Sequence, residues 1–146
     1  MVWILDDGDF LERRYSRVHS ISFNGSVTVA GSPSPHIVPA PWSCADAVDP
    51  EAMFTASLSA CHMLWFLDLA ARAGFTVAAY RDAAEGTLGK NTDGKMAMTR
   101  VVLRPVIDFT GERRPTPDEI AALHHAAHQA CSIANSVTTE VVVEGL

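Results

Sequence analysis

Two of the three cysteines, Cys61 and Cys131, stand where a thiol could do chemistry. Cys61 lies in a long apolar stretch, between Ala60 and His62, and Cys131 lies in the segment HQACSIANS. A buried cysteine is more often a small apolar core residue than a reactive group. The alternative is that the core-facing stripes of two helices bring the sulfurs together, so that one acts as a thiolate nucleophile and the other as its disulfide partner. From the residues alone, both interpretations stay open.

The histidines offer a second candidate chemistry. His124 and His128 have the i, i+4 spacing that zinc sites use, and His125 and His62 add two more imidazoles. The chain has no HExxH glutamate and no CxxC pair to complete such a site. We therefore predict a solvated helix face rather than a metal site, and expect no cofactor. Cys44, in a proline-rich loop, is predicted to be a bystander rather than a third redox participant.

A helix predicted from Asp49 to Ala73 positions the first cysteine. Its first residue can act as the N-cap, Pro50 suits the first helical position, and Glu51 favours the positive end of the helix dipole. Gly74 supplies the stop. Apolar side chains point in every direction along this helix, a pattern typical of a helix that is buried on all sides.

A second helix carries the other cysteine. It begins at the capping box Thr116-Pro117-Asp118-Glu119 and is predicted to end near Asn135. Its apolar stripe consists of Ile120, Leu123, Ala127, Ala130 and Ile133.

The remaining pattern is one of strands and hairpins. Strands are predicted at Met1–Leu5, Arg17–Phe23, Ser26–Ala30 and Val137–Val143, with a long hairpin formed by Thr76–Leu88 and Met96–Phe109 and an irregular loop over Gly31–Asp49. The order β-β-β-α-β-β-α-β predicts an α+β fold, with antiparallel sheets packed around two main helices in a single domain, 1–146. An all-apolar helix on so small a sheet also suggests a second subunit on its other side.

Composition excludes several classes of partner. The net charge is −6 and the 11 Lys and Arg residues are scattered, which argues against nucleic acid or an anionic membrane as a partner. The acidic N-terminus is unlike a signal peptide, and the longest uncharged apolar stretch, Ala52–Leu67, has 16 residues, short of a membrane span. We expect a cytoplasmic protein, in which a disulfide is transient and catalytic.

Two segments resemble the OsmC/Ohr family of organic hydroperoxide reductases. DPEAMFTASLSACHMLWFLDLAARAGF (Asp49 to Phe75) resembles the family's first-cysteine helix, which opens on Asn/Asp-Pro-Glu and reaches its cysteine ten residues after the glutamate. ALHHAAHQACSIANSV (Ala122 to Val137) resembles the second-cysteine helix, although Ser132 stands where many members have proline. The hairpin between them also matches, so the resemblance covers nearly the whole chain and implies an OsmC-like, intertwined homodimer.

The resemblance implies a role for each site residue. Cys61 matches the peroxidatic cysteine, Cys131 the resolving cysteine, and Glu51 the glutamate that holds a catalytic arginine. Of Arg13, Arg14 and Arg17, we choose Arg17 as that arginine, because YSRVHSIS best matches the family's arginine-containing stretch.

The implied reaction is that of a thiol peroxidase. Arg17 favours the Cys61 thiolate and the charge that develops on the peroxide oxygens. Cys61 becomes a sulfenic acid, Cys131 resolves it to a disulfide, and an external dithiol, for which the resemblance suggests a lipoyl type, reduces that disulfide. Phe54 and Trp65 are candidate substrate-binding residues for the alkyl part of an organic hydroperoxide. The alternative is a non-catalytic redox sensor or small-molecule-binding member of the family.

Helix geometry adds a constraint on this site. Glu51 and Cys61 are ten residues apart, which corresponds to about 15 Å along one unbroken helix. Glu51 therefore cannot easily serve the Cys61 of its own chain. We expect a dimer with composite sites, in which Glu51 and Arg17 come from the partner subunit.

Overall fold

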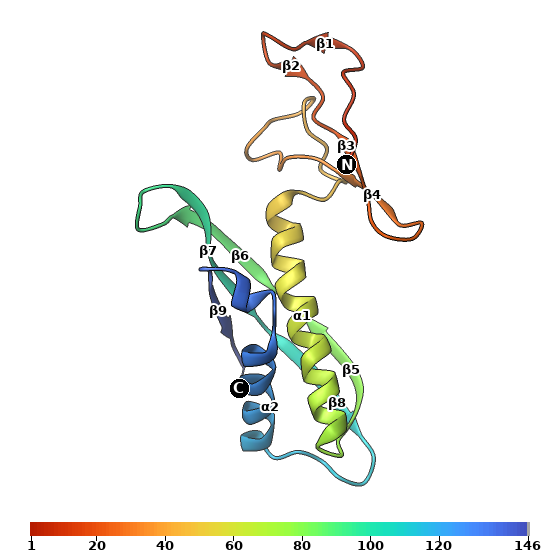
Figure 1. Ribbon diagram of the computed structural model, residues 1–146, viewed down its shortest axis with the longest axis vertical. Coiled ribbons are helices and arrows are strands. Elements are labelled where there is room, and N and C mark those ends of the chain that lie inside the picture. Colours follow the sequence, from red (N-terminus) through yellow and green to blue (C-terminus); the bar gives the residue numbers. More distant parts are fainter. Residues whose placement is uncertain (146) are drawn as a thin grey trace. The chain divides into compact units, whose positions relative to one another are not determined.

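The computed structural model describes residues 1–145 (Figure 1). The elements are β1 (Gly8–Asp9), β2 (Arg14–Tyr15), β3 (His19–Ser22), β4 (Thr28–Gly31), α1 (Pro50–Arg72), β5 (Thr76–Asp82), β6 (Glu85–Lys90), β7 (Met96–Leu103), β8 (Pro105–Thr110), α2 (Pro117–Ala130), the 3-10 turn η1 (Ala134–Ser136) and β9 (Glu140–Val143). The chain forms two compact units, one over Met1–Met53 and one from Phe54 onward.

The N-terminal unit consists of two small antiparallel hairpins. β3 pairs with β4 as predicted, and β1 pairs with β2. The predicted strand over Met1–Leu5 is wrong: within it only Val2 forms a bridge, to Ser20. The side chain of Trp3 instead donates a hydrogen bond to the Ser16 carbonyl and packs on Phe10 and Tyr15. No helix or strand follows between β4 and α1, so the irregular loop is confirmed.

Helix α1 lies within one residue of the predicted bounds at each end, because its capping signals are local. The Asp49 carboxylate accepts a hydrogen bond from the Ala52 N–H at 2.7 Å, and Gly74 takes the left-handed conformation (φ 79°) that ends the helix. The prediction of burial on all sides is wrong within one chain. Leu64 and Trp65 are 62% and 37% exposed, because the sheet and α2 together cover only one face. That buried face consists of Thr55, Leu58, His62, Phe66 and Ala70.

By length and composition, α1 is also the one described helix apolar enough to cross a membrane, a property that core helices of soluble proteins share.

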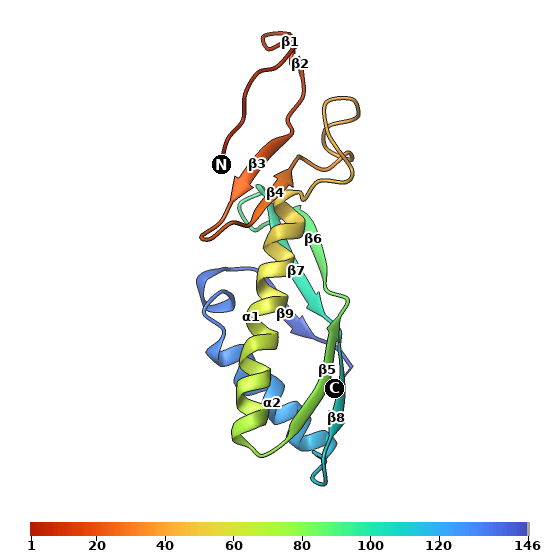
Figure 2. The same cartoon turned by 90° about the vertical axis from the view of Figure 1, so that its right-hand side faces the viewer.

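The predicted long hairpin is confirmed, and it is broken in the middle. β6 pairs with β7 and β5 with β8, with the break at the residue before Pro105. At this point the Asp82 carboxylate accepts hydrogen bonds from the Arg104 N–H and from the Ser59 hydroxyl of α1. β9 joins the other edge of β7 in parallel. In both views α1 lies along the hairpin and α2 packs beside it (Figures 1 and 2).

Helix α2 starts as predicted and ends early. Thr116 and Glu119 form the reciprocal capping box. The helix ends at Ala130, five residues before the predicted end, because Cys131 adopts an extended backbone (φ −68°, ψ 106°). The chain then turns through η1 into β9. The α+β class with antiparallel sheets and two main helices is confirmed, with the parallel β7–β9 pair as an addition.

Gly86 of β6 sets how closely α1 approaches the sheet. A Cβ at this position would overlap the buried Thr55 hydroxyl oxygen of α1 as well as the Met98 side chain. A Cβ on Gly89, in the same strand, would lie 3.4 Å from Thr99 Oγ1, an ordinary contact.

We therefore expect Gly86→Ala to lower the free energy of unfolding by about 1–3 kcal/mol, because a well-packed contact becomes overfilled. Gly89→Ala is the matched control, and it should leave that free energy unchanged or slightly higher, since alanine restricts the unfolded chain. Urea unfolding of the three proteins measures both effects. Equal stability of the two variants would contradict the close approach of α1 to β6.

Candidate active site

The structure brings Cys61 and Cys131 into contact. Cys61 lies in the middle of α1 and is half-buried, whereas Cys131 follows the last residue of α2 and is 1% exposed. The thiol of Cys131 donates a hydrogen bond to the Cys61 sulfur. Both cysteines are free thiols. The two cysteines predicted to act together are therefore in direct contact, and both belong to the C-terminal unit of the same chain.

The turn after α2 also acts on the Cys61 thiol and lowers its pKa. Ile133 contributes to this lower pKa through its backbone, and Ser132 through its backbone and its side chain. Cys131 has its own donors in the same turn: the Ala134 N–H lies 3.3 Å from its sulfur, and the Ile133 N–H also contributes. The turn after α2 thus affects the ionisation of both thiols.

These contacts separate the pKa values of the two thiols. Burial alone raises the pKa of Cys61, but the hydrogen bonds from Cys131, Ile133 and Ser132 outweigh it and bring the pKa below its ordinary value. Burial and the hydrogen bond to Cys61 raise the pKa of Cys131, against a smaller opposing effect of the Ala134 N–H. As pH rises, Cys61 is therefore the first of the two to become a thiolate.

A buried histidine pair lies next to the cysteines, and sequence reasoning missed it. The His62 Nε2 and His124 Nδ1 atoms are 2.9 Å apart, the rings are stacked, and both residues are at most 2% exposed. The predicted solvated face is therefore wrong for His124, although His125 is exposed as expected. Among residues 1–145, no group of three His, Cys, Asp or Glu side chains could hold a metal ion.

Burial keeps both histidines neutral. It lowers the pKa of His62 to about 4, helped by His128 and opposed by Asp82. Burial and the neighbouring His62 lower the pKa of His124 to about 4, again opposed by Asp82. A neutral imidazole cannot stabilise a thiolate by charge, so the hydrogen bonds around Cys61 are its stabilising contacts in the C-terminal unit.

Arg17 belongs to the N-terminal unit. Its guanidinium donates to the carbonyl oxygens of Tyr15 (2.9 Å) and Arg13 (3.1 Å) and lies 4.2 Å from the centroid of the Tyr15 ring. Arg14, the alternative arginine, pairs with Asp9 at 3.8 Å on an exposed surface. Glu51 is half-buried in the first turn of α1.

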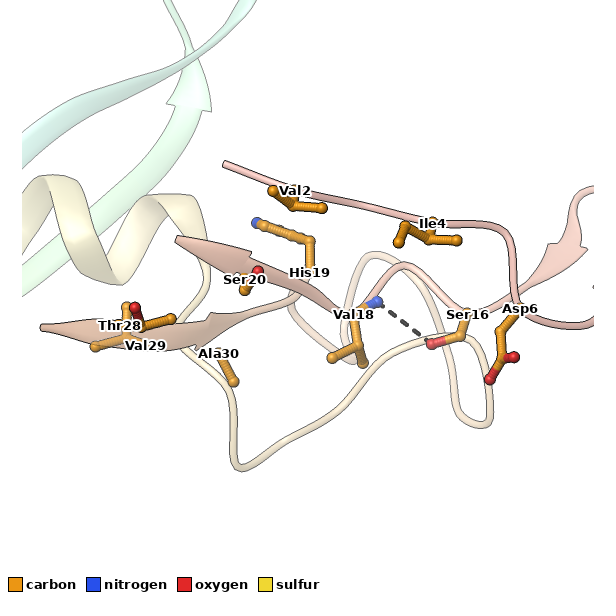
Figure 3. A pocket seen from close by; sticks show the side chains of 10 residues that line it. All are labelled: Val2, Ile4, Asp6, Ser16, Val18, His19, Ser20, Thr28, Val29 and Ala30. Atoms are coloured by element: carbon orange, nitrogen blue, oxygen red, sulfur yellow. Dashed lines mark hydrogen bonds between the residues drawn. The ribbon is translucent and has the colours of Figure 1, made fainter. Parts of the chain in front are cut away.

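Arg17 also borders an apolar pocket of about 460 Å³ within the N-terminal unit. Its lining consists of Met1, Trp3, Phe10, Tyr15, Arg17, His19, Pro33 and Pro50. A second hollow, about 730 Å³, lies beside the β3–β4 hairpin, with Val2 and Ile4 on one side and Thr28 and Val29 on the other (Figure 3).

The two cysteines of the predicted site therefore lie together in the C-terminal unit. The predicted arginine, Arg17, belongs to the N-terminal unit. The candidate substrate-binding residues lie in the C-terminal unit. Phe54 packs against the buried cluster of Leu58, Val101 and Leu103, whereas Trp65 is partly exposed.

Comparison with known proteins identifies the family. Residues 44–144 match the family model described as OsmC-like protein. The chain belongs to the OsmC-like protein family. This confirms the resemblance drawn from the two cysteine motifs. No curated protein matches the chain.

Solved structures agree with this assignment. An OsmC-like protein of unknown function from Vibrio cholerae is 48% identical, with a TM-score of 0.95 over 98% of this chain and 94% of that one. A putative organic hydroperoxide resistance protein from the same organism, with captopril bound in one of its active sites, is 25% identical (TM-score 0.67; 90% and 87% covered). An organic hydroperoxide resistance protein from Elizabethkingia anophelis, 19% identical, shares the fold (TM-score 0.65; 87% and 90% covered).

The neutral histidine pair predicts acid sensitivity. In the unfolded chain both imidazoles bind protons below their ordinary pKa of 6.5, whereas in the folded protein they do so only near pH 4. The unfolded state therefore binds more protons between these values, and stability falls as pH falls through that window. From pH 7 to pH 5 we expect a loss of about 2 kcal/mol for each independently titrating histidine.

Urea unfolding over this pH range tests the prediction. The double variant H62L/H124L should have a much flatter profile, and His125→Gln, which removes an exposed histidine from the same helix, should keep the wild-type slope. A wild-type slope in H62L/H124L would assign the acid sensitivity to other groups.

Proposed function

We propose that this OsmC-like protein is a thiol-dependent peroxidase that reduces organic hydroperoxides. The observation that carries the proposal is the hydrogen-bonded pair of Cys61 and Cys131, in which the first thiol has a lowered pKa and the second a raised one. A nucleophile that ionises first, beside a protonated partner, is the arrangement that a two-cysteine peroxidase needs. The relatives named organic hydroperoxide resistance proteins support the substrate class.

The first step oxidises Cys61. Its thiolate attacks one oxygen of the hydroperoxide, the O–O bond breaks, and the alkoxide leaves and takes a proton to become the alcohol. Cys61 is then a sulfenic acid. In the second step the Cys131 thiolate attacks the Cys61 sulfur and releases the hydroxyl group as water after protonation, which leaves a disulfide. An external dithiol then reduces this disulfide by exchange, with two electrons.

The coupling between the two thiols orders these steps. While Cys61 is a thiolate, its charge and its hydrogen bond keep Cys131 protonated. Conversion of Cys61 to a neutral sulfenic acid removes that charge, so the pKa of Cys131 falls and its thiolate forms when it is needed. The resolving thiol is thereby kept from reacting before the first cysteine has been oxidised.

Arg17 and Glu51 complete the proposed site. A guanidinium stabilises both the thiolate and the charge that develops on the peroxide oxygens, and Glu51 would hold it through a bidentate pair. The ten residues between Glu51 and Cys61 on the continuous helix α1 favour an arrangement in which the partner subunit of a homodimer supplies Glu51 and Arg17. The exposed apolar side chains of Leu64 and Trp65 support such a partner.

The remaining partners follow from the family. We propose an organic hydroperoxide whose alkyl group contacts Trp65 and Phe54, and a dithiol reductant of the lipoyl type. Free thiols at Cys44, Cys61 and Cys131 are consistent with a reducing, cytoplasmic location. A scattered and net negative charge supports the absence of a nucleic-acid or membrane partner.

One observation favours a second function. The Arg17 guanidinium is engaged by the Tyr15 and Arg13 carbonyl oxygens, while Cys61 has hydrogen-bond donors of its own. A member of this kind could form the Cys61–Cys131 disulfide once, as a redox sensor, without rapid turnover.

Cysteine variants test the peroxidase. With tert-butyl hydroperoxide and a dithiol, Cys61→Ser should abolish peroxide consumption, because no thiolate remains to attack. Cys131→Ser should react once and stall as a sulfenic acid or its adduct. Cys44→Ser is the matched control and should retain activity. Mass mapping after stoichiometric oxidation should find the Cys61–Cys131 disulfide; its absence would contradict the two-cysteine mechanism, and disulfide formation without turnover would favour the sensor.

Subunit mixing tests the source of the arginine. Arg17→Gln should lower kcat/KM by about a hundredfold or more, and Arg14→Gln, the control, should not. If sites are composite, a dimer of one Cys61→Ser and one Arg17→Gln subunit regains one complete site. Statistical exchange of the two inactive proteins should then restore about a quarter of wild-type activity. An inactive mixture that contains heterodimers would place Arg17 and Cys61 of one chain in the same site.

A further inference from the structure

A buried hydrogen bond joins the two helices that carry the cysteines. The Nε2 atom of His62 in α1 and the Nδ1 atom of His124 in α2 are 2.9 Å apart, and the two ring planes are within 7° of parallel. The residues are only 1% and 2% exposed. Water therefore cannot easily take the place of either ring, and each imidazole depends on the other for this contact.

The imidazole pair and the cysteines lie on the same parts of the two helices. His62 directly follows Cys61 in α1. His124 precedes Cys131 by seven residues, close to two full turns, so these two residues share one face of α2. His124, Ala127 and Cys131 are all at most 2% exposed, which shows that this face is turned toward the core. A shift of one helix along the other would therefore move the imidazoles and the thiols together.

The apolar contacts around the pair specify the register of the helices less sharply than the hydrogen bond does. The His124 ring packs on the ring of Phe66, with centroids 4.4 Å apart. Phe66 belongs to a buried cluster with Ala70, Phe75, Leu123 and Ala127. Apolar burial is non-directional, and the short alanine side chains oppose sliding only weakly. A hydrogen bond weakens steeply when its angle or distance changes, so the imidazole pair favours one register.

We propose that His62 and His124 are positioning residues, whose hydrogen bond holds α1 and α2 in the register in which Cys61 and Cys131 form their disulfide. The inference rests on the proposed function, since it concerns the disulfide of that reaction. Both imidazoles act through the helix that carries them, not on the reacting atoms. A disulfide requires Cα atoms about 4.4–6.8 Å apart, so a small shift between the helices weakens it.

The experiment measures the equilibrium constant for oxidation of Cys61 and Cys131 in dithiothreitol redox buffers at pH 7, in a Cys44→Ser background. In this exchange the protein dithiol gives two electrons and two protons to oxidised dithiothreitol and becomes the disulfide. H62L/H124L replaces both polar groups by apolar ones, so the fold should remain stable. Its equilibrium constant should nevertheless fall about tenfold, since the hydrogen bond no longer selects the register.

Two further variants distinguish positioning from general stability. His62→Gln is the conservative variant: its amide can donate or accept, so it can pair with either tautomer of His124 and should restore most of the wild-type constant. Phe75→Leu is the matched control. Phe75 belongs to the same buried cluster but lies in neither helix. Its replacement should lower the free energy of unfolding, measured with urea, and leave the equilibrium constant unchanged.

The wild-type protein provides an independent measurement. If the hydrogen bond holds the register in which the disulfide forms, it must be present in both the reduced and the oxidised protein. With isotope-labelled histidine, its ring N–H should give a slowly exchanging NMR signal in both states. Loss of this signal on oxidation would overturn the inference, whether or not H62L/H124L folds.

The outcome separates this inference from the proposed peroxidase, because the redox equilibrium needs no hydroperoxide. A lower constant in folded H62L/H124L, restored in His62→Gln, supports the positioning role even if tert-butyl hydroperoxide is not consumed. Equal constants in wild type and H62L/H124L overturn it even if the protein is an active peroxidase. A similar fall in Phe75→Leu also overturns it, because packing in general would then set the constant, and so does a wild-type protein that forms no disulfide in these buffers.

Discussion

The site depends on the early end of α2 at Cys131. In an α-helix that continued to Asn135, the N–H groups of Ser132 and Ile133 would donate to the carbonyl oxygens four residues earlier. The extended backbone of Cys131 frees these two donors from the helix ladder, and the backbones of Ser132 and Ile133 instead lower the pKa of Cys61. The same break leaves the Cys131 thiol in contact with Cys61. The end of the helix at Cys131 therefore has two effects: it places the Cys131 thiol against Cys61, and it frees the backbone groups that lower the pKa of Cys61.

The buried stripe of α1 explains why Cys61 and its neighbour His62 differ in exposure. Leu58, His62, Phe66 and Ala70 follow each other at intervals of four and face the core, so Cys61 lies at the edge of the stripe and keeps partial exposure. His62 is paired with His124 and stays neutral well below physiological pH. A cationic imidazole beside Cys61 would have stabilised its thiolate. Because burial keeps His62 neutral, the imidazole cannot stabilise the Cys61 thiolate by charge. Hydrogen bonds and, in the proposed dimer, Arg17 stabilise this thiolate instead.

Local signals and long-range contacts differ in how well they could be predicted. The start of each helix was predictable, because Asp49 and the capping box at Thr116 bond to residues within one turn. The end of α2 was not, because Cys131 leaves the helix where helix-forming and apolar residues continue. The His62–His124 pair joins residues 62 positions apart, and no spacing within α2 reveals it. The cysteine pairing was reached only through the family's motifs, since the residues by themselves favoured core packing.

Each of the two units, taken by itself, has exposed apolar side chains. The N-terminal unit contains only two-stranded sheets, and such hairpins are marginally stable unless they pack against another layer. Yet Val2 and Ile4 are more than half exposed. In the C-terminal unit, α1 buries one face and exposes Leu64 on another. In the proposed homodimer, a closed twofold arrangement would cover these faces in both copies at once. The stability of the fold and the completion of the arginine-containing site would then depend on the same association.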